Sequence, residues 1–337
     1  MTREPDHRGR VIVTGSVAFD YLMRFPGHFV EHLIPDRLKH LSVSFLVDDL
    51  RRVPGGCGPN IAYGLALLGE RPLLLASAGQ DALSYRETLA AAGVDVSGLV
   101  IHDDLFTASF FVSTDLDQNQ LASFYSGAMA RARRLSIAEM NVEAGSLAII
   151  SPNDPEAMER YTAECRELSI PFLYDPSQQV ARLSGEELLE GMRGAAMLIV
   201  NDYELGIVSQ KTGLSREALE DLVPVLVATH GAEGSTISAL GPGGRKRHTI
   251  PPARLEAEAV DPTGVGDAFR AGLIRGMRLG LSWEIAGRMG SVAAVFGLES
   301  LGPQPPAYPV EAYLSRYERN FGREPALARL AMRPAPR

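Results

Sequence analysis

The chain has 337 residues and a net charge of −8 at pH 7, with 45% hydrophobic and 22% charged residues. This length allows one large α/β domain with an appendage or two small domains, and the composition is that of an ordinary globular enzyme. The acidic balance argues against a protein that binds nucleic acid through phosphate contacts.

The cysteine content and the amino-terminal segment indicate where the protein works. Two cysteines, Cys57 and Cys165, cannot form a disulfide framework, and they favour a reducing compartment. The first ten residues are polar, and no apolar run reaches the length of a membrane span. We therefore expect a cytoplasmic protein that binds neither membrane nor nucleic acid.

Apolar strands alternate with helices along most of the chain, beginning with a strand at 11–16. A helix over 60–68 has Pro59 in its first turn and ends at Gly69. Further strands are expected at 73–76, 146–150, 172–174, 197–200, 223–228, 235–240 and 245–250. Further helices are expected at 81–92, 154–168, 185–191, 203–210, 215–222, 266–279 and 282–299. This alternation predicts a doubly wound, mainly parallel α/β sheet, followed by a peripheral tail after about residue 318.

Two segments do not fit this core pattern. Period-two alternation over 41–47 predicts a half-exposed antiparallel strand within the segment 17–52. Residues 106–125 also alternate, on both sides of a polar turn, and predict a hairpin. We expect these two insertions to form a small antiparallel sheet that acts as a lid. The core would then consist of residues 1–16, 53–105 and 126–337.

The sequence DPTGVGDAFRAG at 261–272 carries the strongest chemical signal. Glycines on both sides of Val265 allow a tight turn, and a turn that opens a helix directs unpaired N–H groups at an anion. A carboxylate at Asp267 is badly suited to binding phosphate but well suited to taking a proton from a hydroxyl that attacks phosphate. Gly264, Val265 and Gly266 would hold the phosphoryl group. The alternative is an ordinary helix start with an acidic first turn.

Two further motifs lie near the start of the chain. Asp20 comes just after the first strand, where open α/β sheets bind ligands, and it could accept hydrogen bonds from two sugar hydroxyls. Three glycines in 54–60 allow a backbone to approach a ligand closely, and Asn60 adds an amide at the helix start. A solvated turn aspartate and a helix-capping asparagine are the respective alternatives.

Two motifs in the second half could bind a nucleotide and its metal ion. Asn201 and Glu204 follow a buried strand and could hold Mg²⁺ through its waters, or they could form a capping box. The glycines of 229–234 suit a nucleotide phosphate, although a tight turn explains them equally well. The chain has no P-loop, no protein-kinase signature and no cluster with zinc-ligand spacing.

In this order, the motifs resemble those of the ribokinase-like (PfkB) family of carbohydrate and nucleoside kinases, over about residues 11–305. Residues 55–60 are similar to the first family signature and 261–267 to the second, in which Pro262 stands where threonine is commoner. The resemblance to actinobacterial-type adenosine kinases rests on residues 14–27, 44–50 and 175–179.

This resemblance implies phosphorylation of adenosine at its 5′-hydroxyl by ATP and Mg²⁺, a ribokinase-like fold with a β lid, and a homodimer paired through the lids. Asp267 would be the base, Gly264, Val265 and Gly266 the anion hole, and Arg182 a cation for the γ-phosphate. The ribose would be held by Ser16, Asp20, Ser44, Gly56 and Asn60. The adenine would be held by Phe110, Phe124, Met129, Gln178 and Gln179. ATP and Mg²⁺ would be held by Asn201, Glu204, Thr229, Gly231 and Gly234, and a monovalent cation such as K⁺ by Asp261 and Thr263.

Three alternatives remain open at this point. A sugar kinase of the same family would act on ribose or a phosphosugar, and another nucleoside kinase would accept guanosine, inosine or cytidine. A non-catalytic nucleoside-binding protein is the third alternative. The intact Asp267 argues against this last one, because a protein that does not catalyse has no need of a base.

Overall fold

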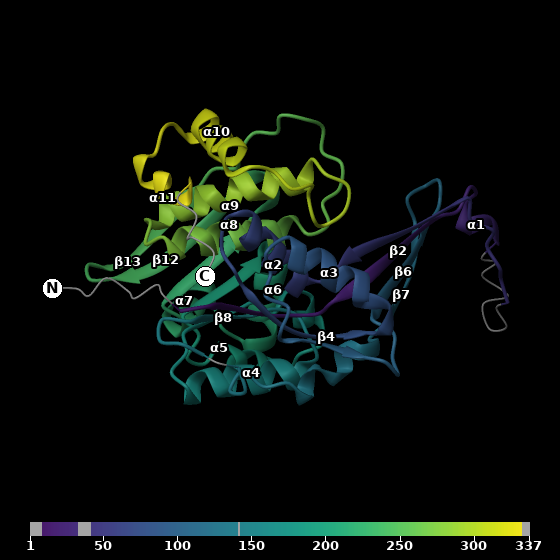
Figure 1. The fold of residues 1–337 in the computed structure, drawn as a ribbon, viewed down its shortest axis with the longest axis horizontal. Coiled ribbons are helices and arrows are strands. Elements are labelled where there is room, and N and C mark those ends of the chain that lie inside the picture. The colour runs from purple at the N-terminus through teal and green to yellow at the C-terminus, as the bar shows by residue number, and fades with distance from the viewer. Residues whose placement is uncertain (1–8, 33–41, 141, 332–337) are drawn as a thin grey trace.

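The computed structural model describes residues 9–32, 42–140 and 142–331, and these contain a nine-stranded and a four-stranded sheet (Figure 1). The larger sheet has the strand order β13-β12-β11-β10-β9-β8-β1-β4-β5. Its strands are β1 (Val11–Thr14), β4 (Leu73–Gly79), β5 (Leu99–His102), β8 (Leu147–Ile150), β9 (Phe172–Tyr174), β10 (Met197–Asn201), β11 (Val225–Thr229), β12 (Ser235–Gly241) and β13 (Gly244–Ile250). All neighbouring strands from β5 to β11 pair in parallel, and β12 and β13 are antiparallel additions at one edge. The predicted doubly wound, mainly parallel sheet is confirmed.

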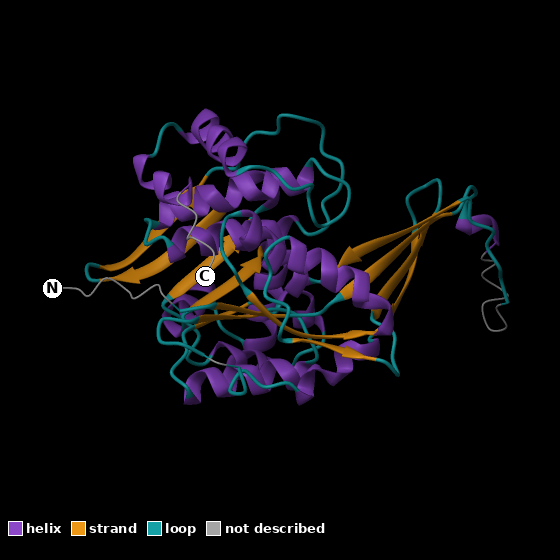
Figure 2. Cartoon of the chain, viewed as in Figure 1, coloured by secondary structure: helices purple, strands orange, loops and turns teal. Residues whose placement is uncertain are grey.

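Helices cover both faces of this sheet (Figure 2). Val11 and Val13 of β1 pack into one hydrophobic cluster, and Ile12 between them packs into the other. Because both faces are buried, the strands are continuous apolar runs rather than alternating ones. One face carries α2 (Cys57–Leu67), α3 (Leu83–Ala91), α8 (Val265–Arg278) and α9 (Trp283–Leu298). The other carries α4 (Pro155–Glu167), α5 (Gly185–Met192), α6 (Asp202–Thr212) and α7 (Arg216–Leu222).

The core elements expected from the sequence are present, with ends shifted by a few residues, and β5 is an unpredicted addition. The tail differs from expectation. Helix α10 (Val310–Phe321) packs against α9, and the short α11 (Ala328–Ala331) packs against α10. Leu327 and Leu330 are buried in the same hydrophobic cluster. The prediction of a peripheral tail is therefore wrong for these residues, because the Arg, Pro and Ala composition hides a few spaced apolar side chains.

The smaller sheet projects from the core at the right of Figure 1. Its strand order is β3-β2-β6-β7, and its strands are β2 (Ala18–Arg24), β3 (Asp49–Gly55), β6 (Ala108–Thr114) and β7 (Gln120–Tyr125). The expected hairpin is the antiparallel pair of β6 and β7. The central strands β2 and β6 pair in parallel, so this lid sheet is mixed rather than wholly antiparallel. The boundaries of the two insertions, 17–52 and 106–125, stay predictions.

The strand expected at 41–47 is absent from its described part, residues 42–47, and Leu41 lies outside the described residues. The alternation there has another cause. Phe45 packs edge-on against Phe25 and Phe29, next to the short helix α1 (Phe29–His32), so a loop covers this alternate apolar side chain in part without joining a sheet, and Leu46 stays exposed. Among the described residues, no helix combines the length and the hydropathy that a membrane crossing requires.

Candidate active site

Two cavities meet at the first turn of α8. The lid-side cavity, of about 440 Å³, is lined by Gly264 and Asp267 of this turn, and the core-side cavity, of about 530 Å³, by Val265 and Gly266. The lid-side cavity also brings together the predicted residues Ser16, Asp20, Gly56, Asn60, Phe110, Phe124, Met129, Gln178, Gln179, Arg182 and Thr263. The core-side cavity brings together Asn201, Thr229, Gly231 and Gly234. The turn thus lies between two spaces that could each hold one substrate.

The conformation of this turn requires glycine. Gly264 precedes α8 with a φ of 73°, and a Cβ atom on it would lie 2.4 Å from Cβ of Pro303. Since Gly264 has no side chain, no side-chain oxygen caps the helix. The N–H groups of a first helical turn lack intrahelical partners and carry the positive end of the dipole. They are therefore suited to an anion placed between the two cavities.

Asp267 lies in the third position of α8 and is only 8% exposed. Its Oδ2 accepts a hydrogen bond of 2.9 Å from Nδ2 of Asn60. Asn60 is itself held by Gln304, whose Nε2 donates to Asn60 Oδ1 at 3.1 Å. Burial raises the pKa of Asp267, while the Arg270 guanidinium and the Asn60 hydrogen bond act in the opposite direction. A partly desolvated carboxylate held in one orientation is suited to general-base catalysis.

A buried ion pair, which the sequence does not reveal, lies behind Asp267. Arg270, one helical turn along α8, donates from Nη2 to Asp175 Oδ1 at 2.6 Å, and its Nε lies 2.6 Å from Asp175 Oδ2. Burial raises the pKa of Asp175 to about 7, and the guanidinium of Arg270 counteracts this rise. Arg270 also interacts with the charges of Asp267 and Glu204. One cation therefore balances three buried carboxylates next to the α8 turn.

The lid contributes a row of side chains to the lid-side cavity. Asp20 of β2 is in register with Phe110 of β6, and Phe110 is in register with Phe124 of β7, so the three lie side by side on one face. This places a carboxylate next to an aromatic surface. Burial, with a smaller contribution from the charge of Asp261, raises the pKa of Asp20 to about 6.

The glycine motif near the amino terminus brings two loops together. Gly56 has a φ of 94°, and a Cβ atom on it would lie 2.3 Å from the carbonyl oxygen of Ser16. Across the cavity, the two glutamines differ: Gln179 is buried and donates to the Asn153 carbonyl at 2.8 Å, whereas Gln178 is exposed. Gln178 is therefore the amide that is freer to bind a ligand.

Asn201 and Glu204 form the capping box that was the alternative to a metal site. Asn201 Oδ1 accepts from the Glu204 N–H, and Glu204 Oε2 accepts from the Asn201 N–H, both at 2.8 Å. The two roles are compatible, because Glu204 is buried and its Oε1 has no hydrogen-bond partner among the described residues. An unshared carboxylate oxygen fits Mg²⁺ held through water.

Three predicted residues do not line either cavity: Ser44, Glu204 and Asp261. Ser44 is exposed in the loop before β3. The carboxylate of Asp261 accepts from the N–H groups of Thr263 at 2.8 Å and Gly302 at 3.0 Å. Asp261 therefore ties the glycine motif to the loop after α9, and both of its oxygens already accept hydrogen bonds.

The sequence did not predict the apolar lining of the core-side cavity. It includes Leu255, Phe269, Ala294, Val295 and Leu298. These side chains come from a loop, from α8 and from α9, and each is part of an ordinary apolar pattern in its own segment. Such a surface can hold a flat base next to the phosphate-binding glycines.

The sequence pattern of the pfkB family carbohydrate kinases matches residues 14–310. The chain belongs to the pfkB family. The members of this family are described as carbohydrate kinases, enzymes that transfer a phosphoryl group between two substrates.

Several relatives extend over the same length. The nucleoside kinase of Methanothermobacter thermautotrophicus is 28% identical over 94% of this chain and 98% of its own. The structure of Burkholderia thailandensis nucleoside kinase in complex with inosine is 34% identical, with a TM-score of 0.81 over 93% of this chain and 99% of its own. The same enzyme in complex with ADP-inosine is 35% identical, with a TM-score of 0.79 over 94% of this chain and 97% of its own. These relatives are named nucleoside kinases rather than adenosine kinases.

Proposed function

We propose that this pfkB-family protein is an ATP-dependent nucleoside kinase that phosphorylates the 5′-hydroxyl. The observation that carries the proposal is the α8 turn, which lies between two cavities and holds a buried carboxylate beside the backbone N–H groups of a helix start. The names of the relatives favour a nucleoside such as inosine over the narrower expectation of adenosine alone. Adenosine is therefore one candidate substrate among several nucleosides.

In the proposed reaction, the nucleoside binds in the lid-side cavity and ATP in the core-side cavity. Asp267 accepts the proton of the 5′-hydroxyl as its oxygen forms a bond to the γ-phosphorus, and the bond from that phosphorus to the β,γ-bridging oxygen breaks. The N–H groups of the α8 turn and the guanidinium of Arg182, which lines the lid-side cavity, stabilise the transferring group. Positioning and electrostatics supply most of the catalysis in such a transfer.

We infer that the nucleotide and its metal bind at the ends of β10 and β11. Asn201 and Thr229 are in register there, and both line the core-side cavity with Gly231 and Gly234. Mg²⁺, held through water near Glu204, would neutralise charge on the phosphates. Potassium near Asp261 and Thr263 also stays a proposal, and its test is the rate with and without K⁺.

The lining of the lid-side cavity favours a nucleoside over a free sugar as the substrate. Phe110, Phe124 and Met129 give the lid-side cavity an apolar wall against which a base can stack, and a sugar alone has no such group. ATP consumption that depends on an added nucleoside would distinguish this enzyme from a non-catalytic nucleoside-binding protein. If ATP is not consumed while nucleoside binds, the kinase proposal is wrong.

The raised pKa of Asp20 leads to a pH prediction. The ionised carboxylate accepts hydrogen bonds from ribose hydroxyls, and below about pH 6 it must first lose a proton. Nucleoside affinity should therefore weaken as pH falls below 6, by at most about tenfold per pH unit. Calorimetric titration of inosine without ATP, from pH 5 to 8, measures this. The Asp20→Asn variant should bind inosine more weakly than the wild type at pH 8, and its affinity should no longer change with pH. If the affinity of the variant still falls below pH 6, Asp20 is not the group responsible.

We also propose a homodimer paired through the outer face of the lid. Tyr21 and Phe111 stack there with ring centroids 4.7 Å apart, and Phe111, Leu121 and Tyr125 are 38%, 41% and 44% exposed. Exposed apolar side chains that are contiguous on one sheet favour an interface. Sedimentation should give a dimer for the wild type and a monomer for Phe111→Asp. A monomeric wild type would contradict the proposal.

A further inference from the structure

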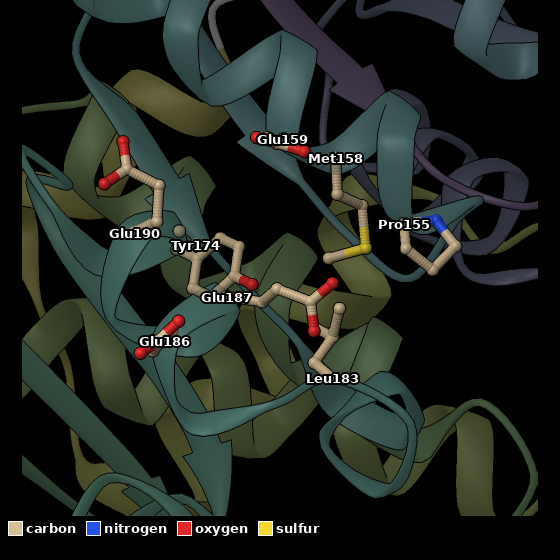
Figure 3. A pocket seen from close by; sticks show the side chains of 9 residues that line it. Pro155, Met158, Glu159, Tyr174, Leu183, Glu186, Glu187 and Glu190 are labelled. Carbon is tan, nitrogen blue, oxygen red and sulfur yellow. The ribbon is translucent and has the colours of Figure 1, made fainter.

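A third cavity, of about 200 Å³, lies between α4 and α5 (Figure 3). It shares no lining residue with the two substrate cavities. Its apolar surface comes from Pro155, Met158, Leu183 and the ring of Tyr174. Four glutamates surround this surface: Glu159, Glu186, Glu187 and Glu190. The space equals the liquid volume of about seven water molecules at ~30 Å³ each, so it suits a small ligand.

Two of the four carboxylates already have partners in the protein. Glu190 accepts from Arg166 at 2.8 Å and lies 3.3 Å from Arg193. Glu187 accepts from the Ser184 N–H at 2.7 Å, and the charge of Lys211 lies nearby.

The other two, Glu159 and Glu186, are exposed and have no ion pair or side-chain hydrogen bond within the described residues. The rim therefore keeps an excess of negative charge.

Tyr174 provides an independent indication of a ligand. It is 2% exposed, and its hydroxyl has no hydrogen-bond partner among the described residues. The lack of a side chain at Gly191 makes room for this ring, because a Cβ atom there would lie 2.4 Å from the hydroxyl oxygen. Figure 3 shows Tyr174 among the side chains of Glu186, Glu187 and Glu190. The hydroxyl oxygen is not among the fully buried polar atoms that lack a partner, so it opens into the cavity, where it can hydrogen-bond to a ligand.

We propose that this cavity binds a small organic cation, an amine or amidine with an apolar body. The apolar body would pack on Met158, Leu183 and the face of Tyr174. The charged group would lie at the rim near Glu159 and Glu186, with the Tyr174 hydroxyl as an acceptor. An inorganic cation would leave the apolar surface unused, and a neutral ligand would leave the carboxylates unused.

The segment from 174 to 183 lines this cavity with both of its ends and the lid-side cavity with its middle. The link between the two cavities that follows rests on the proposed function. Gln178 and Arg182 of this segment line the lid-side cavity, and its Asp175 pairs with Arg270. Ser177 within it has a φ of 40°, a conformation that few residues other than glycine adopt. An occupant that contacts both ends of a strained segment would alter nucleoside affinity.

Calorimetry of the full chain without nucleoside or ATP tests the binding step. Benzamidine is the probe, and neutral benzamide of the same shape is its control. We expect saturable binding of benzamidine and at least about fivefold weaker binding of benzamide. The double variant Glu159→Gln/Glu186→Gln should weaken benzamidine binding about fivefold, and Tyr174→Phe about threefold. Glu87→Gln, an exposed glutamate of α3, should change nothing.

Equal binding of the two probes, or variants that bind benzamidine like the wild type, would overturn the proposed site. These outcomes do not depend on the kinase reaction, so the site and the proposed function fail separately. Inosine titration with and without saturating benzamidine then tests the connection. We expect the inosine Kd to shift at least about twofold, and to stay constant in the double variant. If saturating benzamidine does not change the inosine Kd of the wild type, the proposed connection between the two cavities is wrong.

Discussion

Replacing Asp267 with asparagine should lower kcat by about 10²–10⁴-fold, the usual contribution of a positioned general base. The amide cannot accept the proton of the 5′-hydroxyl, but it has nearly the same shape. Its oxygen can still accept the hydrogen bond from Asn60. Nucleoside affinity should therefore stay near that of the wild type. Steady-state rates combined with calorimetric titration of inosine measure the two effects.

The matched control is Glu311→Gln, which alters an exposed acidic residue in the first turn of α10. It should leave both quantities unchanged, because Glu311 lines neither substrate cavity. If Asp267→Asn keeps a near-normal kcat, the acidic first turn of α8 is an ordinary helix start and the proposed mechanism is wrong.

Replacing Arg270 with methionine should lower the free energy of unfolding by about 3–5 kcal/mol, because it leaves a buried carboxylate without its cation. Asp175 is fully buried and has Arg270 as its ion-pair partner. Asp267 and Glu204 would also lose this neighbouring charge. Urea denaturation followed by circular dichroism measures the loss.

The double variant Asp175→Asn/Arg270→Met separates charge balance from packing. If the ion pair is the reason for the loss, the second substitution should restore a large part of the stability, since the two effects are then non-additive. Additive losses would mean that the shape of Arg270, rather than its charge, matters. The exposed ion pair of Arg24 and Asp48 is a control, because removing one of its partners should cost at most about 1 kcal/mol.

The parts of the site that the sequence predicts are those encoded in contiguous segments. Residues 261–267 specify a turn, a helix start and a carboxylate within seven positions, and the structure places them together. The same holds for Asn201 and Glu204, where the local pattern allowed two interpretations and the geometry shows the capping box.

The parts that the sequence does not predict depend on contacts between distant segments. Asp175 and Arg270 are 95 positions apart, and Gln304 and Asn60 are 244 apart. Each member fits an ordinary local pattern, so no spacing rule links them. The parallel pairing of β2 with β6 was missed for the same reason, since only the tertiary fold brings these two strands together.

The most direct test of the account is the rate of ADP release from ATP and Mg²⁺ with inosine, adenosine, ribose or no acceptor, each with and without K⁺. The account predicts rapid release with a nucleoside, matched mole for mole by the nucleoside 5′-monophosphate, and much slower release with ribose. Release that is equally fast with ribose, or that does not depend on any acceptor, would contradict it.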